Sequence, residues 1–590
     1  MTIGLYILAL AVTVQSIIVE PPIVTTPYGK LRGKYYAVPG KCTAELYRRI
    51  PYAKPPIGEF RWKKPQEWTD EWKGERDATF IGPACAEGST DQFPKGGYSE
   101  DCLHINVYTS TECRKKSCPV VYYMHGGGQL WDSSVLFPDN YLVKNFVAHD
   151  VILVTVGYRM SMFGTLALGD ENLLPANLAL HDAIAGLKFT REIIDHFGGD
   201  KERITIMGHS GGAGMVMNIA FSPGISPPEK PLLFKSAIAM SGSVVLRHEE
   251  DHIAKTRKYA SSMKCYGSSE EIMACLRTKT TLELCQTQYN ISGDDIYHPA
   301  QLGGIALTGE LFPIRNNYDF FDQPAKFRYM TGTILREVDH LTKHGNLDAL
   351  QYDAFLNPSE VMEQNEEDQT QGKGYFNHTQ LTIQLFTDTW RTAAAEVEKA
   401  GGETYLYEYE YRKHSGHAAD LSYIIGIHGF ERDENEEWLA QVYPVYFANF
   451  AKGMAPAPDW TPLDTKKMNF YAINKSINGT ISPRMKDDYH RDLLDYWAGE
   501  IVHYDHSVTL QKIKLINQPV QYHKLFLAPK AGESELHHTM SDIWNFITSP
   551  KFIMFAIGCV FLVSAGYCIG RCSKKTYSCE RQPLLQHMIY

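Results

Sequence analysis

Short, continuous apolar runs in the first half of the chain predict buried β-strands. Two such runs are Val120-Val-Tyr-Tyr-Met124 and Val151-Ile-Leu-Val-Thr-Val156, and apolar runs of this length suit strands that are covered on both faces, as in a parallel sheet. Residues 177–197 then carry a helical pattern, and residues 404–411 alternate in a way that predicts another strand. Strands mixed with helices favour an α/β fold with a central, mostly parallel sheet.

A third β-branched run leads directly into Gly208-His209-Ser210-Gly211-Gly212, and helix-compatible residues follow. This G-x-S-x-G pattern between a strand and a helix is typical of a nucleophile elbow, which holds a serine in a strained, exposed turn. Glycines flank the serine because a Cβ would clash where the backbone closes on itself. The free N–H groups at the start of the helix would face developing negative charge. The alternative interpretation is an ordinary glycine turn.

A second glycine-rich segment, His125-Gly126-Gly127-Gly128, directly follows the first apolar run. It matches the HGGG type of oxyanion loop, whose bare backbone lets N–H groups approach a substrate oxygen. A serine nucleophile needs such donors and also needs a base beside it. In this architecture the acid and the base follow the serine along the chain. The chain has 22 histidines, so spacing alone does not choose the base.

Both ends of the chain are apolar. Residues 3–14 are typical of a signal peptide, predicted as residues 1–16, with a buried first strand as the alternative. Residues 552–570 are long and apolar enough to cross a bilayer as a helix. The basic residues that follow place the tail, residues 571–590, in the cytosol. We therefore expect a single-pass membrane protein whose residues 17–545 form a lumenal or extracellular domain.

The cysteines and glycosylation sequons agree with that location. An oxidising compartment allows disulfides, and three pairs would close short loops, Cys85 with Cys102, Cys113 with Cys118, and Cys265 with Cys275. Connectivity stays open at this point, also for Cys42 and Cys285, because sequence alone does not determine it. Four N-x-[ST] sequons lie in the expected lumenal part, at Asn290, Asn377, Asn474 and Asn478.

Composition narrows the function classes. The chain has 590 residues, of which 44% are hydrophobic, and a net charge of −10. Nucleic acid is not an expected partner, because phosphate binding needs a concentrated basic face. Two acidic runs, residues 363–368 and 431–437, are expected to be solvated loops. We predict no cofactor and no metal site, and the oligomeric state stays open.

Several motifs, in one order along the chain, are similar to those of the type-B carboxylesterases, the family that includes the cholinesterases. The similarity extends from about residue 28 to about residue 524. Besides the elbow and the oxyanion loop, its motifs are residues 50–62, 99–107, 158–159, 197–200, 241–243 and 447–451. The resemblance implies an α/β-hydrolase fold and a serine ester hydrolase that forms an acyl-enzyme and acts on small ester substrates.

The resemblance also implies roles for individual residues. The segment Gly332-Thr-Ile-Leu-Arg-Glu337 matches the family's acid, which gives Glu337, and Gly426-Ile-His-Gly-Phe-Glu431 matches its base, which gives His428. With Ser210 these complete the predicted catalytic triad. The resemblance further implies two disulfides and three oxyanion donors, namely Cys85–Cys102, Cys265–Cys275, and the amides of Gly127, Gly128 and Gly211.

The chain departs from the family pattern at three positions. His209 replaces the usual glutamate before the serine, Gly211 replaces alanine, and Val338 replaces the glycine after Glu337. The segment between Cys85 and Cys102 contains no tryptophan, so the aromatic face that cholinesterases use for a quaternary ammonium is missing there. We therefore expect neutral acyl esters rather than choline esters as substrates.

Two alternatives remain beside ester hydrolysis. The same acyl-enzyme could pass its acyl group to an alcohol or amine, and sequence does not separate this transfer from hydrolysis. A catalytically silent adhesion protein similar to the neuroligins would share the fold and the membrane anchor, but such proteins lack parts of the triad. The tail segment, residues 580–585, resembles an acidic dileucine signal, which predicts an endolysosomal organelle or the plasma membrane.

Overall fold

The structure is a computed structural model that describes residues 20–38, 40, 42–88, 97–244, 246–292, 302–314, 319–339 and 355–517. The chain divides into two units, Met1–Gln511 and Lys512–Tyr590. Of the second unit, only residues 512–517 are described, as the end of helix α15 (Ile501–Asn517). The predicted signal peptide (1–16), membrane helix (552–570) and tail (571–590) lie outside the described residues. Within the described residues, we find no helix with the length and apolar character needed to span a membrane.

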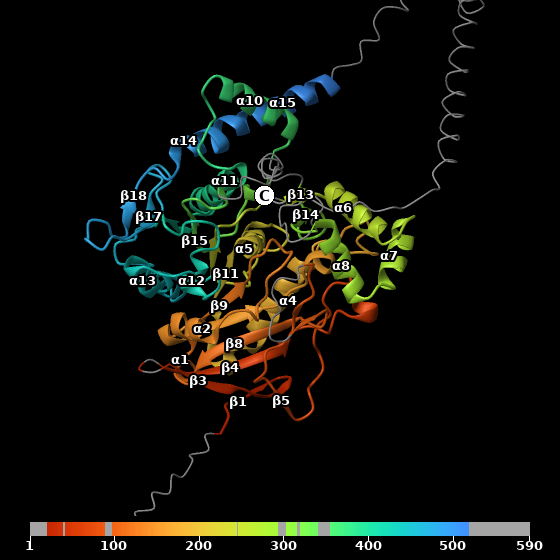
Figure 1. Cartoon of the computed structure of the whole chain (residues 1–590), viewed down its shortest axis with the longest axis vertical. Coiled ribbons are helices and arrows are strands. Elements are labelled where there is room, and N and C mark those ends of the chain that lie inside the picture. Colours follow the sequence, from red (N-terminus) through yellow and green to blue (C-terminus); the bar gives the residue numbers. More distant parts are fainter. Residues whose placement is uncertain are drawn as a thin grey trace, which may run out of the picture. The chain divides into compact units, whose positions relative to one another are not determined.

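An eleven-stranded sheet forms the centre of the first unit (Figure 1). Its strands, in spatial order, are β18 (Arg484–Lys486), β17 (Phe470–Ile473), β16 (Glu403–Tyr409), β15 (Arg328–Ile334), β12 (Ser236–Met240), β11 (Gly199–His209), β9 (Cys118–Met124), β10 (Ile152–Val156), β8 (His104–Ser110), β4 (Cys42–Pro51) and β3 (Lys34–Val38). Neighbours from β17 to β10 pair in parallel, and the outer pairs are antiparallel. The prediction of a mixed α/β fold with a mostly parallel sheet is confirmed.

The smaller sheets and the helices surround this sheet. The smaller strands are β1 (Ile23–Thr26), β2 (Gly29–Arg32), β5 (Glu75–Asp77), β6 (Ala84–Cys85), β7 (Tyr98–Ser99), β13 (Leu246–His248) and β14 (Ile305–Leu307). The α-helices up to α15 are α1 (Cys113–Lys116), α2 (Asp139–Asn145), α3 (Ser161–Gly164), α4 (Leu178–Ile193), α5 (Gly211–Phe221), α6 (Glu249–Ser262), α7 (Ser269–Arg277), α8 (Thr281–Ser292), α10 (Pro358–Thr370), α11 (Gln380–Ala395), α12 (Leu421–Ile424), α13 (Glu434–Ala451) and α14 (Arg491–Leu494).

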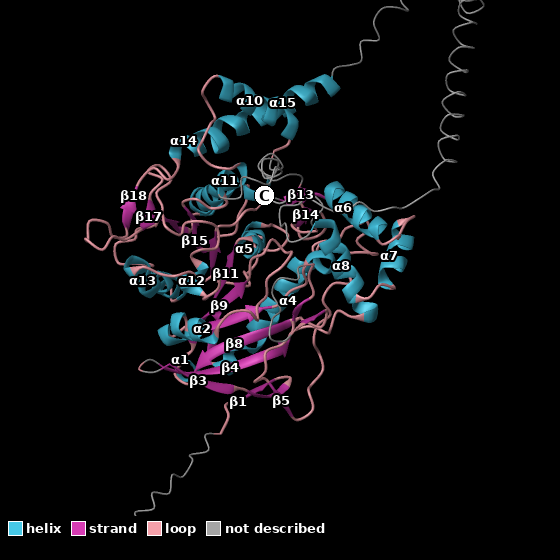
Figure 2. Cartoon of the chain, viewed as in Figure 1, coloured by secondary structure: helices cyan, strands magenta, loops and turns pink. Residues whose placement is uncertain are grey.

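Helices cover both faces of the sheet (Figure 2), which explains why the central strands β9 and β10 are buried along their whole length. Side chains alternate along a strand, so Val120 and Tyr122 of β9 pack in one core cluster with residues of α4 and α5. The intervening Val121 and Tyr123 pack in a second cluster with residues of α2, α12 and α13. The predicted strands at residues 120–124, 151–156 and 404–411 correspond to β9, β10 and β16, and the predicted helix corresponds to α4 and a following 3-10 turn.

The expectation of loops for the two acidic runs is wrong over much of their length. Residues 363–368 lie within α10, which begins with Pro358 at its first turn. Residues 434–437 form the first turn of α13, where Asp433 and Glu436 make a reciprocal capping box. Carboxylates are favourable at a helix start because they face the unpaired N–H groups there. The acidic run at residue 431 therefore marks a helix N-terminus.

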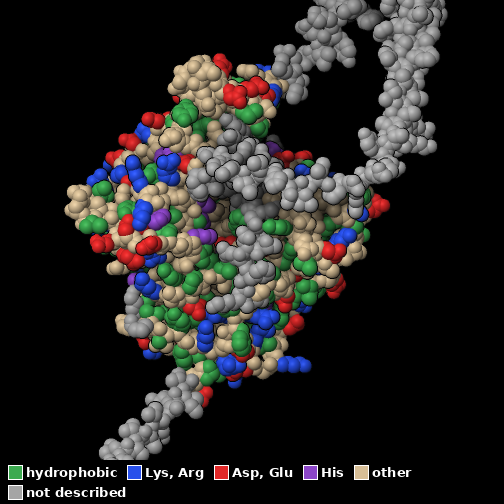
Figure 3. All heavy atoms as spheres, in the orientation of Figure 1, with side chains coloured by type: hydrophobic (Ala, Val, Ile, Leu, Met, Phe, Trp, Pro, Cys, Tyr) green, Lys and Arg blue, Asp and Glu red, His purple; other side chains and the backbone are tan. Residues whose placement is uncertain are grey.

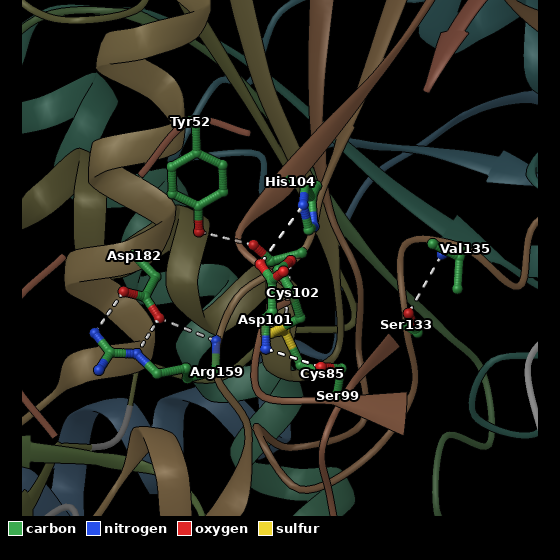
Figure 4. The surroundings of a disulfide bond; sticks show 11 residues. Tyr52, Cys85, Ser99, Asp101, Cys102, His104, Ser133, Val135, Arg159 and Asp182 are labelled. Carbon is green, nitrogen blue, oxygen red and sulfur yellow. Dashed lines mark hydrogen bonds and ion pairs between the residues drawn. A yellow bond between two sulfur atoms is a disulfide. The ribbon is translucent and has the colours of Figure 1, made fainter. Parts of the chain in front are cut away.

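Three disulfides are present among the described residues. Cys85 pairs with Cys102, as seen in Figure 4, and Cys265 pairs with Cys275, which confirms both pairs implied by the resemblance. Cys113 pairs with Cys118, so the short loop left open by the sequence is also closed. The sequon residues Asn290, Asn377 and Asn478 are exposed, whereas Asn474 is half-buried. Side chains of both charge signs are interspersed on the face drawn in Figure 3.

A buried ion pair joins the segment after β10 to α4. The Arg159 guanidinium donates to both carboxylate oxygens of Asp182 at 2.7 Å, and the Arg159 amide donates to one of them at 3.0 Å (Figure 4). The two side chains are 3% and 0% exposed. Both carboxylate oxygens of Asp182 therefore accept from the same residue, which ties the segment after β10 to α4.

Candidate active site

Ser210 lies at a sharp turn between β11 and α5. Its backbone has φ 54° and ψ −123°, a strained conformation for a residue with a side chain, and its amide donates to the Met240 carbonyl at 2.9 Å. A Cβ on Gly208 would lie 2.4 Å from the Gly212 carbonyl, and one on Gly212 would lie 2.3 Å from the carbonyl oxygen of His125. Only glycine fits at both positions. The predicted elbow geometry is confirmed, and Ser210 stays partly exposed at its tip.

A histidine and a glutamate complete a continuous hydrogen-bonded chain with Ser210. His417 Nε2 lies 2.7 Å from Ser210 Oγ, and His417 Nδ1 lies 2.7 Å from Glu337 Oε2. Glu337 is fully buried, and its second oxygen accepts the Ile334 amide at 2.8 Å. The His417 amide also donates to the Glu337 carbonyl oxygen at 2.7 Å. This arrangement requires the tautomer in which Nδ1 donates to Glu337 and Nε2 accepts from the serine hydroxyl.

The assignment of His428 as the base is wrong in this geometry. His428 is exposed, follows helix α12, and makes no hydrogen bond to Ser210 or Glu337 within the described part of the chain. Both histidines lie between β16 and α13, and the His-Gly-x-Glu pattern selected the wrong one. The buried run Leu421–Ile425 shortly after His417 is the signal that could have identified it. These residues anchor the His417 segment on the core, whereas His428 lies beyond the turn at Gly426.

The oxyanion loop packs directly against the start of α5. Gly127 and Gly128 have φ 85° and 61°, and a Cβ on Gly211 would lie 2.6 Å from the Gly128 amide nitrogen. The Gln129 side chain donates to the Gly211 carbonyl oxygen at 2.8 Å and so ties the loop to the helix. Among the described residues, no acceptor pairs with the amides of Gly127, Gly128 or Gly211. The three predicted donors therefore stand together and have unused N–H groups.

Two further buried residues, Gln129 and Tyr158, contact the oxyanion loop or the helix beside it. The ring of Tyr158 stacks on His125 with centroids 4.3 Å apart, and the Tyr158 hydroxyl donates to the His125 carbonyl at 2.7 Å. Burial lowers the pKa of His125 to about 4, so this ring is neutral at physiological pH. Gln129 and Tyr158 were not identified as site residues from the sequence. Their roles depend on contacts with residues far along the chain, which local patterns do not contain.

A second histidine, His209, lies against His417. The rings of His209 and His417 have centroids 4.8 Å apart. His209 is 2% exposed, and burial, with the nearby His417 and His428, lowers its pKa well below the ordinary value. Near His417, the buried Asp420 accepts the Tyr443 hydroxyl at 2.9 Å, and burial raises the pKa of Asp420 to about 7.

One group of potential metal ligands occurs among the described residues, and it lies apart from Ser210 in the sequence. It consists of Cys113, Cys118 and Asp150. Both sulfurs are joined in a disulfide, so neither can act as a thiolate ligand. This group therefore does not provide a metal centre.

Comparison with known proteins identifies the family. The family model described as the carboxylesterase family matches residues 20–497. A liver carboxylesterase of Sus scrofa is 26% identical over 549 residues, which cover 82% of this chain and 94% of the relative. Carboxylesterase 1C of Rattus norvegicus is 26% identical over 76% of this chain and 89% of its own length. A juvenile hormone esterase of Tribolium castaneum is 34% identical over 46% of each chain. The chain therefore belongs to the carboxylesterase family and is a serine ester hydrolase.

Proposed function

We propose that the protein hydrolyses carboxylic esters through an acyl-enzyme on Ser210, with His417 as the base and Glu337 as its partner. The observation that carries this proposal is the pair of 2.7 Å contacts that His417 makes, one with each of the other two residues. A serine hydroxyl alone is a poor nucleophile, and a base within hydrogen-bond reach is what activates it.

The proposed reaction has two similar halves. His417 Nε2 takes the proton of Ser210 Oγ as this oxygen bonds to the ester carbonyl carbon, and the same nitrogen then gives the proton to the departing alcohol. Water next gives a proton to Nε2 as its oxygen attacks the acyl carbon, and Ser210 Oγ leaves with that proton. Glu337 holds the imidazole in the required tautomer and stabilises the imidazolium formed in each half.

The oxyanion that forms in each half needs donors that are already in place. The unused amides of Gly127, Gly128 and Gly211 supply them without reorganisation. Removal of one such donor typically costs about 3 kcal/mol of transition-state stabilisation, so these amides account for a large part of the proposed rate enhancement. The hydrogen bond from the Gln129 side chain to the Gly211 carbonyl oxygen holds the loop next to the start of the helix, so the three amides stay close together.

We further propose neutral acyl esters as the substrate class. His209 stands where a carboxylate would favour a cationic alcohol, and the segment between Cys85 and Cys102 has no tryptophan to stack on a quaternary ammonium. The names of the relatives, carboxylesterases and a juvenile hormone esterase, also denote ester substrates. Choline esters should therefore be turned over less efficiently than neutral esters of similar size.

Labelling with a fluorophosphonate tests the nucleophile. The reagent should modify the wild-type protein on Ser210 and should leave Ser210→Ala unlabelled, whereas equal labelling of both would refute the assignment. Incubation with a panel of acyl esters, with and without an added alcohol or amine, then shows whether the free acid or a transferred acyl product forms. Efficient turnover of choline esters would contradict the proposed substrate class.

We also propose that the catalytic unit lies in the lumen or outside the cell and is held by the C-terminal apolar segment. The support is the pattern of residues 1–16 and 552–570 together with the exposed sequon residues Asn290, Asn377 and Asn478. A glycosidase that removes N-linked glycans should lower the apparent mass of the protein from cells. A full-length protein that lacks glycans and is found throughout the cytosol would contradict this location.

A further inference from the structure

His209 is the last residue of β11 and directly precedes the proposed nucleophile, yet the proposed reaction does not use it. Its ring lies against the ring of His417, at 4.8 Å between centroids and with 39° between the ring planes. The side chain cannot move freely because it is 2% exposed. His209 therefore presents a fixed group to the imidazole that must accept the serine proton.

The hydrogen bonding of His209 indicates a neutral ring. Its Nε2 is buried and has no partner among the described residues. A protonated imidazole carries an N–H on both nitrogens, so a charged His209 would bury a donor without an acceptor, which is costly. The neutral tautomer with its proton on Nδ1 leaves only an unused lone pair at Nε2. The geometry thus favours a neutral His209 independently of any titration.

Among the described residues, three other ionisable groups lie around His417, and Glu337 is the one that carries a negative charge in acid. Glu337 bonds to Nδ1, and Asp420 is a buried carboxyl whose pKa is raised to about 7 by burial, so it is protonated in acid. His428 contributes an imidazole and no negative charge. In acid, only Glu337 among these groups stabilises the protonated form of His417.

We propose that His209 is a positioning residue whose neutral ring packs against His417. Because it adds no negative charge there, His417 stays unprotonated, and Ser210 reactive, in acidic surroundings. This inference rests on the proposed function, because it assumes that His417 must be neutral to accept the serine proton. A carboxylate at position 209 would stabilise the imidazolium instead. At an effective dielectric constant of about 20, a charge about 5 Å away would raise the midpoint of the acid limb by about 2.4 pH units.

The test compares the wild type with His209→Glu, His209→Gln and a matched exposed-histidine control, His428→Gln. For a neutral ester, kcat/KM should fall as the pH is lowered. The midpoint of this fall should agree, within about 0.3 pH unit, among the wild type, His209→Gln and His428→Gln. The midpoint of His209→Glu should rise by about 2.4 pH units, with activity retained above it. Fluorophosphonate labelling of Ser210, carried out at one pH above all the midpoints, corrects each rate for the fraction of active enzyme.

A second measurement keeps the inference testable whatever the catalytic result. Hydrogen–deuterium exchange at the imidazole C2 carbon, followed by mass spectrometry of the His417 peptide, reports the protonation midpoint of that ring without turnover. The midpoint should rise in His209→Glu and stay in place in His209→Gln. An unchanged midpoint in His209→Glu, or an equal shift in His209→Gln, would overturn the inference. Absence of ester turnover together with the expected exchange shifts would overturn the proposed function alone.

Discussion

Replacement of the two histidines between β16 and α13 should have very different effects. His417→Gln removes the ring nitrogen that lies 2.7 Å from Ser210 Oγ, so the serine loses the base that takes its proton. General base catalysis is typically worth 10²- to 10⁴-fold, and loss of the imidazolium that Glu337 stabilises adds to this. We expect kcat/KM to fall by at least about 10³-fold, which corresponds to about 4 kcal/mol.

Glutamine is chosen because its amide can still donate to Glu337. That carboxylate is fully buried, so a variant without any donor would leave a buried charge unpaired and would lower stability as well as activity. Thermal unfolding of His417→Gln should therefore stay within a few degrees of the wild type. A large drop in the melting temperature would mean that lost activity cannot be assigned to lost proton transfer.

His428→Gln is the matched control in the same loop. His428 is exposed and lacks a hydrogen bond to Ser210 or Glu337 among the described residues, so kcat/KM should stay within about threefold of the wild type. The assay is initial-rate hydrolysis of a neutral chromogenic ester, normalised to the concentration of folded protein. A loss of 100-fold or more in His428→Gln, with activity retained in His417→Gln, would refute the contact between His417 and Ser210 as the catalytic one.

Three further predictions concern stability. Arg159→Met leaves the fully buried Asp182 without its partner and should lower the free energy of unfolding in urea by about 3–5 kcal/mol. Serine at both Cys265 and Cys275 opens a disulfide with a sequence separation of 10 and should cost about 2–3 kcal/mol by the same measurement. Burial raises the pKa of Glu396 to about 8, so the folded state keeps a proton that the unfolded chain loses near its ordinary value of 4.5. Stability from this group therefore falls as pH rises from about 4.5 to 8, by at most about 1.4 kcal/mol per unit, and Glu396→Gln should remove that slope; an identical slope in both proteins would contradict the assignment.

The parts of the fold that were predictable from sequence are those that local sterics control. Strands covered on both faces must be apolar throughout, which identified β9 and β10. The elbow must have glycine at Gly208 and Gly212, where any Cβ would meet backbone within 2.5 Å. Such constraints limit the residue type at a position directly, and they leave a pattern that can be recognised without knowledge of distant contacts.

The base was not predictable on the same terms, because nothing local requires a histidine at one position of a loop. His417 and His428 differ in the segments that come after them, a buried helix in one case and an exposed turn in the other. The acidic run that begins at residue 431 added to the error. Its carboxylates lie at the N-terminus of α13, next to the unpaired N–H groups of the first turn. In the sequence they resemble the acidic residue expected after the family's histidine.

The topology of the sheet explains why three residues so far apart in sequence meet. Ser210 follows β11, Glu337 follows β15 and His417 follows β16, and these strands are parallel members of the order β16, β15, β12, β11. The carboxyl ends of parallel strands lie along one edge of a sheet, so the segments that leave them share that edge. Since Ile334 at the end of β15 binds the Glu337 side chain through its amide, the acid is fixed by the sheet itself. The histidine is held by its bonds to Glu337 and by α12. A change in the α12 anchor should therefore displace the base while the serine and the acid stay in place.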